Sequence, residues 1–283
     1  MDIEHIAFER LRQGALMSER YYEKPLMITY SGGKDSDVIV NLAIRSGINF
    51  EVVNSHTTAD APQTVRYIRE QFKKWENQGI KCTVEYPTYQ GNPISMWRLI
   101  PLKKMPPTRI VRYCCSVLKE TSGDGRAIAT GVRWAESNSR RNNRGIYEDI
   151  NANKDKRIIL TNDNDDNRRL IEQCEMRAKT VVNSIIDWAD SDVWNYLHDC
   201  KCNGNPLYQC GFDRVGCIGC PMANKKRKFA FSVFPKYRDM YIRAFDRMIK
   251  INNLTGSWKT GYDCYMWWMS ENPAQIVMPG FEI

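Results

Sequence analysis

Apolar and polar positions follow two different spacings along the first part of the chain. Residues 3–22 carry apolar side chains at helical spacing, which predicts an opening helix that ends before Pro25. Short apolar runs with strand character then alternate with longer segments of helical spacing. The expected strands are residues 26–30, 49–54, 81–86, 127–131 and 157–160, and the expected helices are residues 37–46, 62–79 and 114–120. Strands that alternate with helices predict a mostly parallel sheet, with ligands at the carboxyl ends of its strands.

The pattern changes further along. Residues 140–170 are polar and rich in Asn, Asp and Arg, and they are expected to form a long loop or hairpin near the site. Beyond Ile185 the spacing is mainly helical. At 283 residues the chain fits one large α/β domain, or one such domain with an appendage. We predict an α/β fold, with a parallel twisted sheet and helices on both faces in residues 1–180, and a mainly helical C-terminal region in residues 181–283.

Composition narrows the class of protein. Hydrophobic residues make up 42% of the chain, enough for a full core, which excludes a disordered or fibrous protein. No run of about 18 apolar residues occurs, and the charged N-terminus lacks the apolar stretch of a signal peptide, so we expect a cytoplasmic protein. The net charge of +8, from 41 Lys and Arg against 33 Asp and Glu, has two interpretations. It indicates either a basic solvated surface or an anionic partner, such as a polyphosphate nucleotide or a nucleic acid.

A glycine turn joins the first predicted strand to the helix after it, in the sequence Ser-Gly-Gly-Lys-Asp-Ser at residues 31–36. Two glycines let a backbone approach phosphate closely, and the start of a helix supplies amide donors and a positive dipole. Lys34 can neutralise phosphate charge, the serine hydroxyls can donate hydrogen bonds, and Asp35 can orient Lys34 or help to hold Mg²⁺. The alternative is an ordinary turn capped by Ser and Asp, but this combination of residues favours a phosphate-binding loop. Its spacing is shorter than that of a Walker loop.

Four of the ten cysteines form two close pairs, Cys114 with Cys115 and Cys217 with Cys220. In a chain of this kind, metal binding or catalysis is a better interpretation than a disulfide framework. One tetrahedral zinc ion can use four thiolates, but adjacent cysteines are awkward ligands for a single metal atom. A four-iron cluster offers a separate iron to each thiolate, so it fits the adjacent pair better. Zinc and purely structural or redox cysteines remain alternatives, and Cys200, Cys202 and Cys210 are alternative ligands or incidental buried cysteines.

A group of arginines follows the fourth predicted strand, at Arg133, Arg140, Arg141 and Arg144. Guanidinium groups bind phosphate and sulfate in a bidentate manner, so these side chains can grip the far end of a substrate. Arg133 is the strongest candidate, and a solvated basic loop is the alternative for the others. Glu136 can orient Arg133 or contact a hydroxyl or metal ion.

Two further segments have open interpretations. His56 and Asp60 lie in a loop expected at the carboxyl end of a strand, where His56 can contact adenine or act as a base, and a structural histidine is the alternative. The basic run at residues 225–228 follows the second cysteine pair and either touches nucleic acid or flanks a helix.

Five segments in order resemble the phosphoadenosine phosphosulfate (PAPS) reductase family, a branch of the PP-loop N-type ATP pyrophosphatases. They are residues 31–36 (the PP-loop), 56–64 (the loop after the second strand), 112–119 (the double-cysteine segment), 131–137 with Arg140 (the G-x-R-x-x-E-S loop) and 211–221 (the C-x-x-C segment). The resemblance covers about residues 25–225 and implies an adenine nucleotide alpha hydrolase-like fold.

The resemblance also implies a nucleotide site, with Mg²⁺ accompanying ATP and a [4Fe–4S] cluster. The implied nucleotide-binding residues are Ser31, Gly32, Gly33, Lys34, Asp35, Ser36, His56, Gly131, Arg133 and Glu136, of which Lys34, Asp35 and Arg133 are the expected catalytic residues. The implied cluster ligands are Cys114, Cys115, Cys217 and Cys220.

Two features of the resemblance bear on the reaction. The family's reductases attack the sulfur of their substrate with a cysteine in an E-C-G-L-H segment, which this sequence does not contain, and Cys264, its last cysteine, stands in a different context. The intact S-G-G-K-D-S loop is similar to the pyrophosphatase form, which splits ATP between its α and β phosphates. The leading hypothesis is therefore ATP cleavage with adenylation, coupled to an iron–sulfur-dependent sulfur-transfer or redox step.

Two alternatives remain. One is a PAPS or APS reductase that releases sulfite through Cys264 or another thiol, and the other is a non-catalytic, cluster-bearing sensor of nucleotide or nucleic acid. The expected partners are an adenine nucleotide, a nucleic-acid substrate, a thiol or sulfur-donor protein, and a second copy of the chain in a homo-oligomer.

Overall fold

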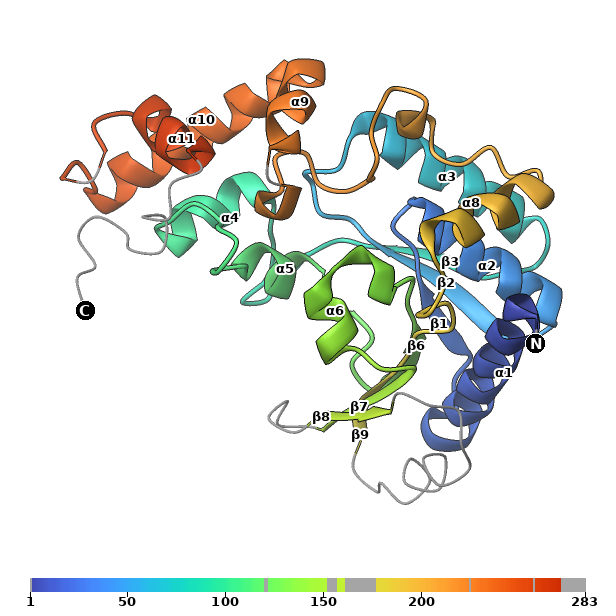
Figure 1. The fold of residues 1–283 in the computed structure, drawn as a ribbon. Coiled ribbons are helices and arrows are strands. Elements are labelled where there is room, and N and C mark those ends of the chain that lie inside the picture. Colours follow the sequence, from blue (N-terminus) through green and yellow to red (C-terminus); the bar gives the residue numbers. More distant parts are fainter. Residues whose placement is uncertain are drawn as a thin grey trace. The chain divides into compact units, whose positions relative to one another are not determined.

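The central feature of the fold is a seven-stranded sheet, seen in a computed structural model of the chain (Figure 1). The model describes residues 2–119, 122–151, 157–160, 177–223, 225–256 and 258–270. In the order in which they pair, the strands are β3 (Cys82–Glu85), β2 (Phe50–Ser55), β1 (Leu26–Thr29), β6 (Arg126–Ala129), β9 (Arg177–Val182), β7 (Tyr147–Asn151) and β8 (Arg157–Leu160). The first five run parallel, and β7 and β8 form an antiparallel hairpin at one edge.

Four helices share one large apolar core with this sheet. They are α1 (Ile3–Tyr22), α2 (Lys34–Ser46), α3 (Pro62–Glu76) and α8 (Asp190–Asp199). On the strands, alternate residues such as Leu26 and Ile28 enter this core, whereas Met27 belongs to a smaller cluster with Val53 and Ile128. This alternation follows from the period of two in a strand, which sends successive side chains to opposite faces. No helix in the described part of the chain is both long and apolar enough to cross a membrane.

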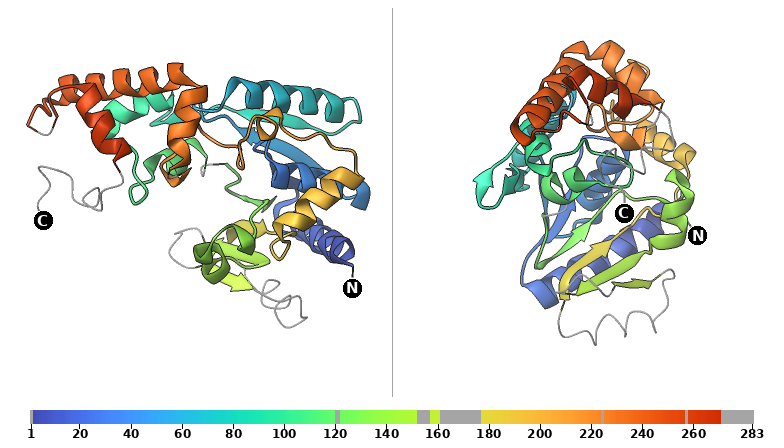
Figure 2. Two further views of the ribbon diagram at one scale, coloured as in Figure 1. Left: turned by 45° about the horizontal axis from the view of Figure 1, so that its top comes forward. Right: turned by 90° about the vertical axis from the view of Figure 1, so that its left-hand side faces the viewer.

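A second group of helices packs around α10 (Pro235–Asn252), which contacts α4 (Met96–Lys103), α9 (Lys226–Val233) and α11 (Gly261–Met269) (Figure 2). The shorter elements of this group are α5 (Tyr113–Leu118), η3 (Pro221–Ala223) and the small hairpin of β4 (Thr88–Tyr89) and β5 (Asn92–Pro93). Its core is aromatic: Trp268 lies 4.7 Å from Tyr241 and 5.3 Å from Phe245, measured between ring centroids. The predicted helical C-terminal region is therefore confirmed.

By their contacts, the two groups form separate compact units, each assembled from three stretches of chain. The first unit comprises residues 1–55, 62–85 and 122–215, and the second comprises residues 56–61, 86–121 and 216–283. These units do not coincide with the boundary predicted between residues 180 and 181. The difference arises because α8 packs on α2 in the first unit, whereas α4 packs on α10 in the second.

The mostly parallel α/β fold is confirmed. The polar segment predicted as a loop or hairpin contains the β7–β8 hairpin, and residues 152–156 and 161–176 lie outside the described residues. The strand β9 was not predicted, because the first four of its six residues are Arg-Ala-Lys-Thr and form no apolar run.

The helix α2 carries one ionisable side chain into the core of the first unit. Asp37 is only 2% exposed, and it accepts hydrogen bonds from the hydroxyls of Tyr30 (2.6 Å) and Tyr67 (3.1 Å). Burial raises the pKa of this carboxyl to about 7, although the two tyrosine hydrogen bonds act in the opposite direction. Asp37 is therefore protonated in the folded chain at pH values at which it is ionised in the unfolded chain.

We expect this difference to appear as a pH-dependent stability. Between pH 3.8 and about 7 the folded state binds the extra proton, so the free energy of unfolding falls as the pH rises through that window. The loss at this site is about 4 kcal/mol at most. An Asp37→Asn variant lacks the ionisation and should gain stability relative to the wild type as the pH rises from 4 to 8, measured by urea unfolding. The exposed Asp199→Asn substitution is the control, and a constant difference between Asp37→Asn and wild type would contradict the buried titration.

Candidate functional site

The loop at residues 31–33 lies at the carboxyl end of β1, where the sheet changes direction. The chain adds β2 and β3 on one side of β1 and later returns to add β6 on the other side. A crevice at such a point is the usual ligand site of an open α/β sheet. The sequence-based prediction of a strand, a glycine turn and a helix is confirmed, since α2 begins directly at Lys34.

Local geometry explains Gly32 and the second serine of this loop. Gly32 has a φ of 72°, and a Cβ there would lie 2.8 Å from Cγ1 of Ile68, so a larger residue would be strained and crowded. The hydroxyl of Ser36 accepts a hydrogen bond from the amide of Gly33 (3.2 Å) and donates one to its carbonyl (2.7 Å). The hydroxyl of Ser31 lies 3.4 Å from that of Ser36. The serines therefore hold the loop in shape at the start of α2.

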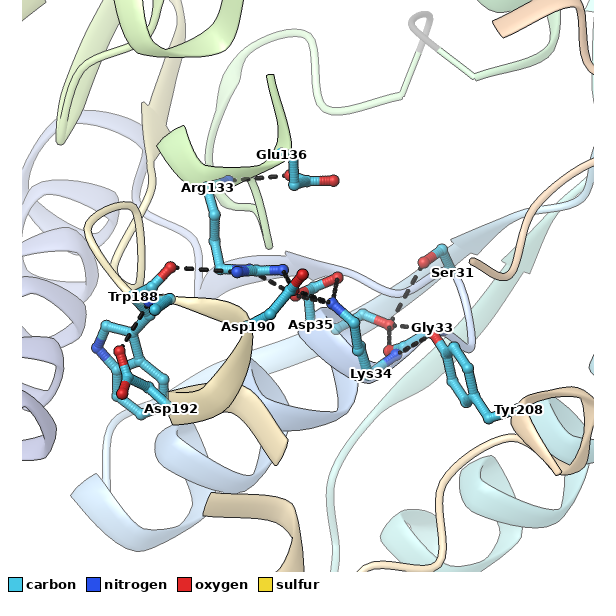
Figure 3. A network of polar contacts seen from close by, with 12 residues as sticks. Ser31, Gly33, Lys34, Asp35, Arg133, Glu136, Trp188, Asp190, Asp192 and Tyr208 are labelled. Atoms are coloured by element: carbon cyan, nitrogen blue, oxygen red, sulfur yellow. Dashed lines mark hydrogen bonds and ion pairs between the residues drawn. The ribbon is translucent and has the colours of Figure 1, made fainter. Parts of the chain in front are cut away.

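Two cations and two carboxylates form a closed network beside the loop (Figure 3). The ammonium group of Lys34 lies 3.2 Å from Asp35 and 3.0 Å from Oδ1 of Asp190. The guanidinium of Arg133, only 1% exposed, donates from Nε to Asp35 (2.6 Å), from Nη2 to Asp190 (2.6 Å) and from Nη1 to the carbonyl of Trp188 (3.1 Å). The bonds from Arg133 and Lys34 lower the pKa of Asp190. The charges balance, so the network fixes the direction of Lys34.

This arrangement bears on what Arg133 can do. Its three nitrogens all donate to protein oxygens, so in this structure it holds Asp35 and Asp190. Phosphate or sulfate binding by Arg133 stays a prediction. Asp190 was not predicted, because an acidic residue in the first turn of a helix is common and the contact with Lys34 spans 156 residues of sequence.

The loop after β6 supplies the remaining predicted residues of the first unit. A Cβ at Gly131 would lie 3.0 Å from Cβ of Asp35, so this glycine lets the loop approach the first turn of α2. Glu136 accepts from the amide of Arg133 (3.0 Å) and pairs with Arg140. Burial, and then the charges of Arg214 and Arg144, lower the pKa of Arg140 to about 10. Glu136 therefore positions the backbone of the loop, and Arg140 belongs to a region of positive charge.

Two residues that the sequence did not reveal also touch the loop. The hydroxyl of Tyr208, in the short helix η2 (Pro206–Tyr208), accepts a hydrogen bond from the amide of Lys34 at 2.9 Å. The side-chain amide of Asn205 donates to the carbonyl of Gly32 at 2.9 Å. No local signal marks them, because both contacts cross more than 170 residues of sequence. Tyr208 thus occupies a helix N-terminal amide of the kind that binds phosphate.

His56 belongs to the second unit, whereas the phosphate-binding loop belongs to the first. Its Nδ1 lies 3.7 Å from a carboxylate oxygen of Asp60, and its ring lies 5.6 Å from that of Tyr86. Asp60 in turn accepts from the amide of Thr57 at 2.9 Å. A role for His56 in nucleotide binding stays a prediction.

All four cysteines predicted as ligands belong to the second unit, whereas Cys200, Cys202 and Cys210 belong to the first. Cys114 and Cys115 lie in α5, and Cys217 and Cys220 lie in the turn that precedes η3. The segment at residues 56–61 contacts Cys217 of the second pair and its neighbour Ile218. The thiol of Cys217 lies 3.3 Å from the hydroxyl of Thr57, and the amide of Ile218 donates to the carbonyl of Ala59 at 2.8 Å.

Electrostatic interactions connect the four thiols. A hydrogen bond with Cys115 raises the pKa of Cys114, and the charges of Cys217 and Cys220 raise it further. The pKa of Cys115 is lowered, first by Cys114 and then by Arg112, whose guanidinium lies 3.2 Å from its sulfur. In the described ranges, however, no three His, Cys, Asp or Glu side chains are placed to hold one metal ion.

A cation missed by the sequence analysis accompanies these thiols. The pKa of Lys119 is raised, first by Cys217 and then by Asp60, Cys220 and Cys115. An ammonium group in that position favours thiolates. The sequence signal was its place four residues after Cys115.

Comparison with known proteins identifies the family. Residues 25–223 match the model of the phosphoadenosine phosphosulfate reductase domain. The chain belongs to the phosphoadenosine phosphosulfate reductase domain family. This confirms the resemblance inferred from the five motifs, and the family's fold is a PP-loop nucleotide-binding fold.

Curated relatives of this family member include two proteins of Methanocaldococcus jannaschii. They are the uncharacterized proteins MJ0066 (24% identical over 83% of this chain and 44% of the relative) and MJ0973 (24% identical over 86% and 53%). The chain therefore spans about half the length of these relatives. An adenosine 5′-phosphosulfate reductase from Burkholderia cepacia is 38% identical over 52 residues, which are 18% of this chain and 21% of that enzyme.

Solved structures with a similar fold are more distant. They include a PAPS reductase from Candida auris (14% identity, TM-score 0.47, covering 75% of this chain and 87% of that one). The U34-tRNA thiolase NcsA from Methanococcus maripaludis with its [4Fe-4S] cluster is 11% identical, with a TM-score of 0.38 over 89% of this chain and 79% of that one. At these identities and scores, neither assigns an activity to this chain.

Tyr208 offers a direct test of phosphate binding at the loop. Because its hydroxyl occupies the amide of Lys34, phosphate must displace it, so we expect Tyr208→Phe to tighten the binding of inorganic pyrophosphate and ATP. Loss of one competing hydrogen bond of about 1 kcal/mol corresponds to about fivefold in Kd. Isothermal titration calorimetry measures the change, and Tyr22→Phe, which removes a hydroxyl bonded to Thr180, is the control. Weaker binding by Tyr208→Phe would instead show that the hydroxyl contacts the phosphate.

Proposed function

We propose that this protein cleaves ATP between its α and β phosphates on residues 31–36 and transfers the adenylyl group to an acceptor, in preparation for an iron–sulfur-dependent sulfur transfer. In this step an acceptor oxygen attacks the α-phosphorus, the bond from that phosphorus to the bridging oxygen breaks, and pyrophosphate leaves with the electron pair. One observation supports the proposal above the others. The loop at the start of α2 stands beside a lysine that Asp35 and Asp190 hold in one direction.

Each residue of the site has a role in this proposal. The amides at the start of α2 bind the phosphates that become pyrophosphate, and Lys34 neutralises the charge that develops on them. Ser31 and Ser36 keep the loop in shape, and their hydroxyls are available to phosphate oxygens. Arg133 acts through the carboxylates of Asp35 and Asp190, so it is a positioning residue in this scheme.

The oxygen donors of the site suit a magnesium ion that arrives with ATP. Magnesium is bound by one or two carboxylates together with phosphates, and it keeps several waters. Asp190 uses Oδ1 for both of its cation contacts, and 71% of its side chain is exposed, so it can take a metal ion on its solvent side. Asp190 is therefore the residue we propose to hold Mg²⁺.

The cysteines suit a [4Fe–4S] cluster in their chemistry. The thiols of the second unit interact electrostatically with one another. Arg112 and Lys119 favour the ionised form of Cys115, and Lys119 opposes the burial that raises the pKa of Cys217 to about 11. Cys114, Cys115, Cys217 and Cys220 would hold the cluster, one iron for each thiolate. A bound cluster would supply an iron site for a sulfur atom or an electron.

The rival hypothesis is a sulfonucleotide reductase that uses Cys264 as its nucleophile. Cys264 lies in α11 and is 0% exposed, and its pKa is raised by burial and then by the charge of Asp263. A buried thiol whose ionised form is disfavoured is a poor nucleophile. The position of Cys264 therefore supports adenylation over reduction by this thiol.

Lys34 provides the test of ATP cleavage. Purified protein incubated with α-labelled ATP and candidate acceptors should yield pyrophosphate and a labelled adenylylated acceptor, which releases AMP once water or a sulfur nucleophile displaces the adenylyl group. Lys34→Ala should lower the rate of pyrophosphate release about 100-fold or more, because it removes charge stabilisation from the leaving group. Lys24→Ala, an exposed lysine before β1, is the matched control and should keep the wild-type rate.

Two results would contradict the proposal. Sulfite release from PAPS with thioredoxin, without cleavage of ATP, would identify a reductase. Unchanged partner binding by Lys34→Ala, with no turnover in the wild type, would identify a non-catalytic sensor.

The cluster has a test of its own. Protein purified without oxygen should contain about four iron and four sulfide atoms per chain, and Cys217→Ser should lose most of both. Cys210→Ser, which changes an exposed cysteine of the first unit, should keep them. Colourless protein with stoichiometric zinc would refute the cluster.

A further inference from the structure

The net positive charge of the chain lies in one of its two units. The second unit carries 16 Lys and Arg against seven Asp and Glu, whereas the first carries 25 against 26. The whole excess of +8 is therefore contributed by the second unit. A surplus of this kind in one part of a protein favours an anionic partner.

The helix α10 arranges part of this charge in a row. One side of the helix is buried, at Tyr241, Ala244, Phe245, Met248 and Ile249. The opposite side exposes four cations, Lys236, Arg243, Arg247 and Lys250. Their spacings of seven, four and three residues bring them to the same side of a helix, and a rise of 1.5 Å per residue makes the row about 21 Å long.

These cations are weakly neutralised. Lys250 has one distant and exposed partner, Asp246, at 3.7 Å. Within the described residues, no ion pair involves Lys236, Arg243 or Arg247. Arg238, the other cation of the helix, pairs with Asp239 at 3.0 Å. Like charges in a row repel one another, and an anion with regularly repeating charges relieves this repulsion when it binds along the row.

An exposed aromatic residue follows a contact between α11 and α10. The amide of Gly261, at the start of α11, donates to Asp246 of α10 at 2.6 Å, so this end of α11 is fixed against the middle of α10. Tyr262 follows directly, and its side chain is 56% exposed. A basic row with an aromatic ring at its side is the combination that holds a nucleic-acid strand by its phosphates and stacks one of its bases.

We propose that the α10 row, meaning Lys236, Arg243, Arg247 and Lys250, binds the phosphodiester backbone of a single-stranded nucleic acid, with Tyr262 stacked on a base. If the proposed function holds, this nucleic acid is the acceptor of the adenylyl group. The binding of the strand to the row does not itself require ATP cleavage. An anionic membrane is disfavoured as the partner, because the apolar side of α10 is buried in its own unit and cannot enter a bilayer.

Fluorescence anisotropy with a labelled single-stranded oligonucleotide tests the row over a series of salt concentrations. The triple variant Arg243→Gln, Arg247→Gln and Lys250→Gln should bind about tenfold more weakly or worse, and its log Kd should depend on log salt with a slope lower by about two. The matched control is Arg66→Gln, Arg69→Gln and Lys73→Gln, which removes three exposed cations from α3 of the first unit. This control should bind like the wild type.

A second variant separates stacking from charge. Tyr262→Ala should weaken binding of the single strand several-fold and leave the salt slope unchanged, because it removes no charge. It should leave binding of a duplex of the same sequence unaffected.

Three outcomes would overturn the inference: wild-type binding by the α10 triple variant, an equal loss in the α3 control, or binding of anionic vesicles in place of the oligonucleotide. The cleavage of ATP is measured in parallel. Oligonucleotide binding that depends on the row, in a protein that makes no AMP, would refute the proposed function and support this inference. ATP cleavage without oligonucleotide binding would support the proposed function and refute this inference.

Discussion

The buried guanidinium of Arg133 is the contact on which the rest of the site depends. It bonds Asp35 at the start of α2, Asp190 at the start of α8 and the carbonyl of Trp188, and so ties three distant segments together. Removing either carboxylate leaves the charge of the buried guanidinium less compensated. Lys34 has a defined direction only because both carboxylates are fixed in this way. The same contacts therefore set both the direction of Lys34 and the charge balance beside the loop.

Much of the fold and part of the site could be predicted from local sequence. The apolar run of β1 is continuous because this strand is buried on both faces, and backbone geometry requires a glycine at Gly32. The family motifs also predicted that Arg133 belongs to the site, and its guanidinium contacts Asp35 beside the loop. In β9, by contrast, Lys179 and Thr180 find polar partners in Ser122 and Asp149, so a buried strand carries polar residues.

The other residues of the site could not be found in this way. Asp190, Asn205 and Tyr208 reach the loop across 156 to 174 residues of sequence, and each belongs to a residue type that is common at helix ends and turns. Tertiary packing decides their roles. The same reason explains why the two units interleave: α4 lies early in the chain, yet it packs with α10 near its end.

This interleaving has a consequence for biosynthesis. Cys115 and Cys217 are 102 residues apart, so at roughly 5–20 residues per second the first thiol pair leaves the ribosome about 5–20 s before the second. During that interval Cys114 and Cys115 are without the partners that they have in the folded second unit. Any prosthetic group that needs both pairs can be inserted only after the second pair has emerged.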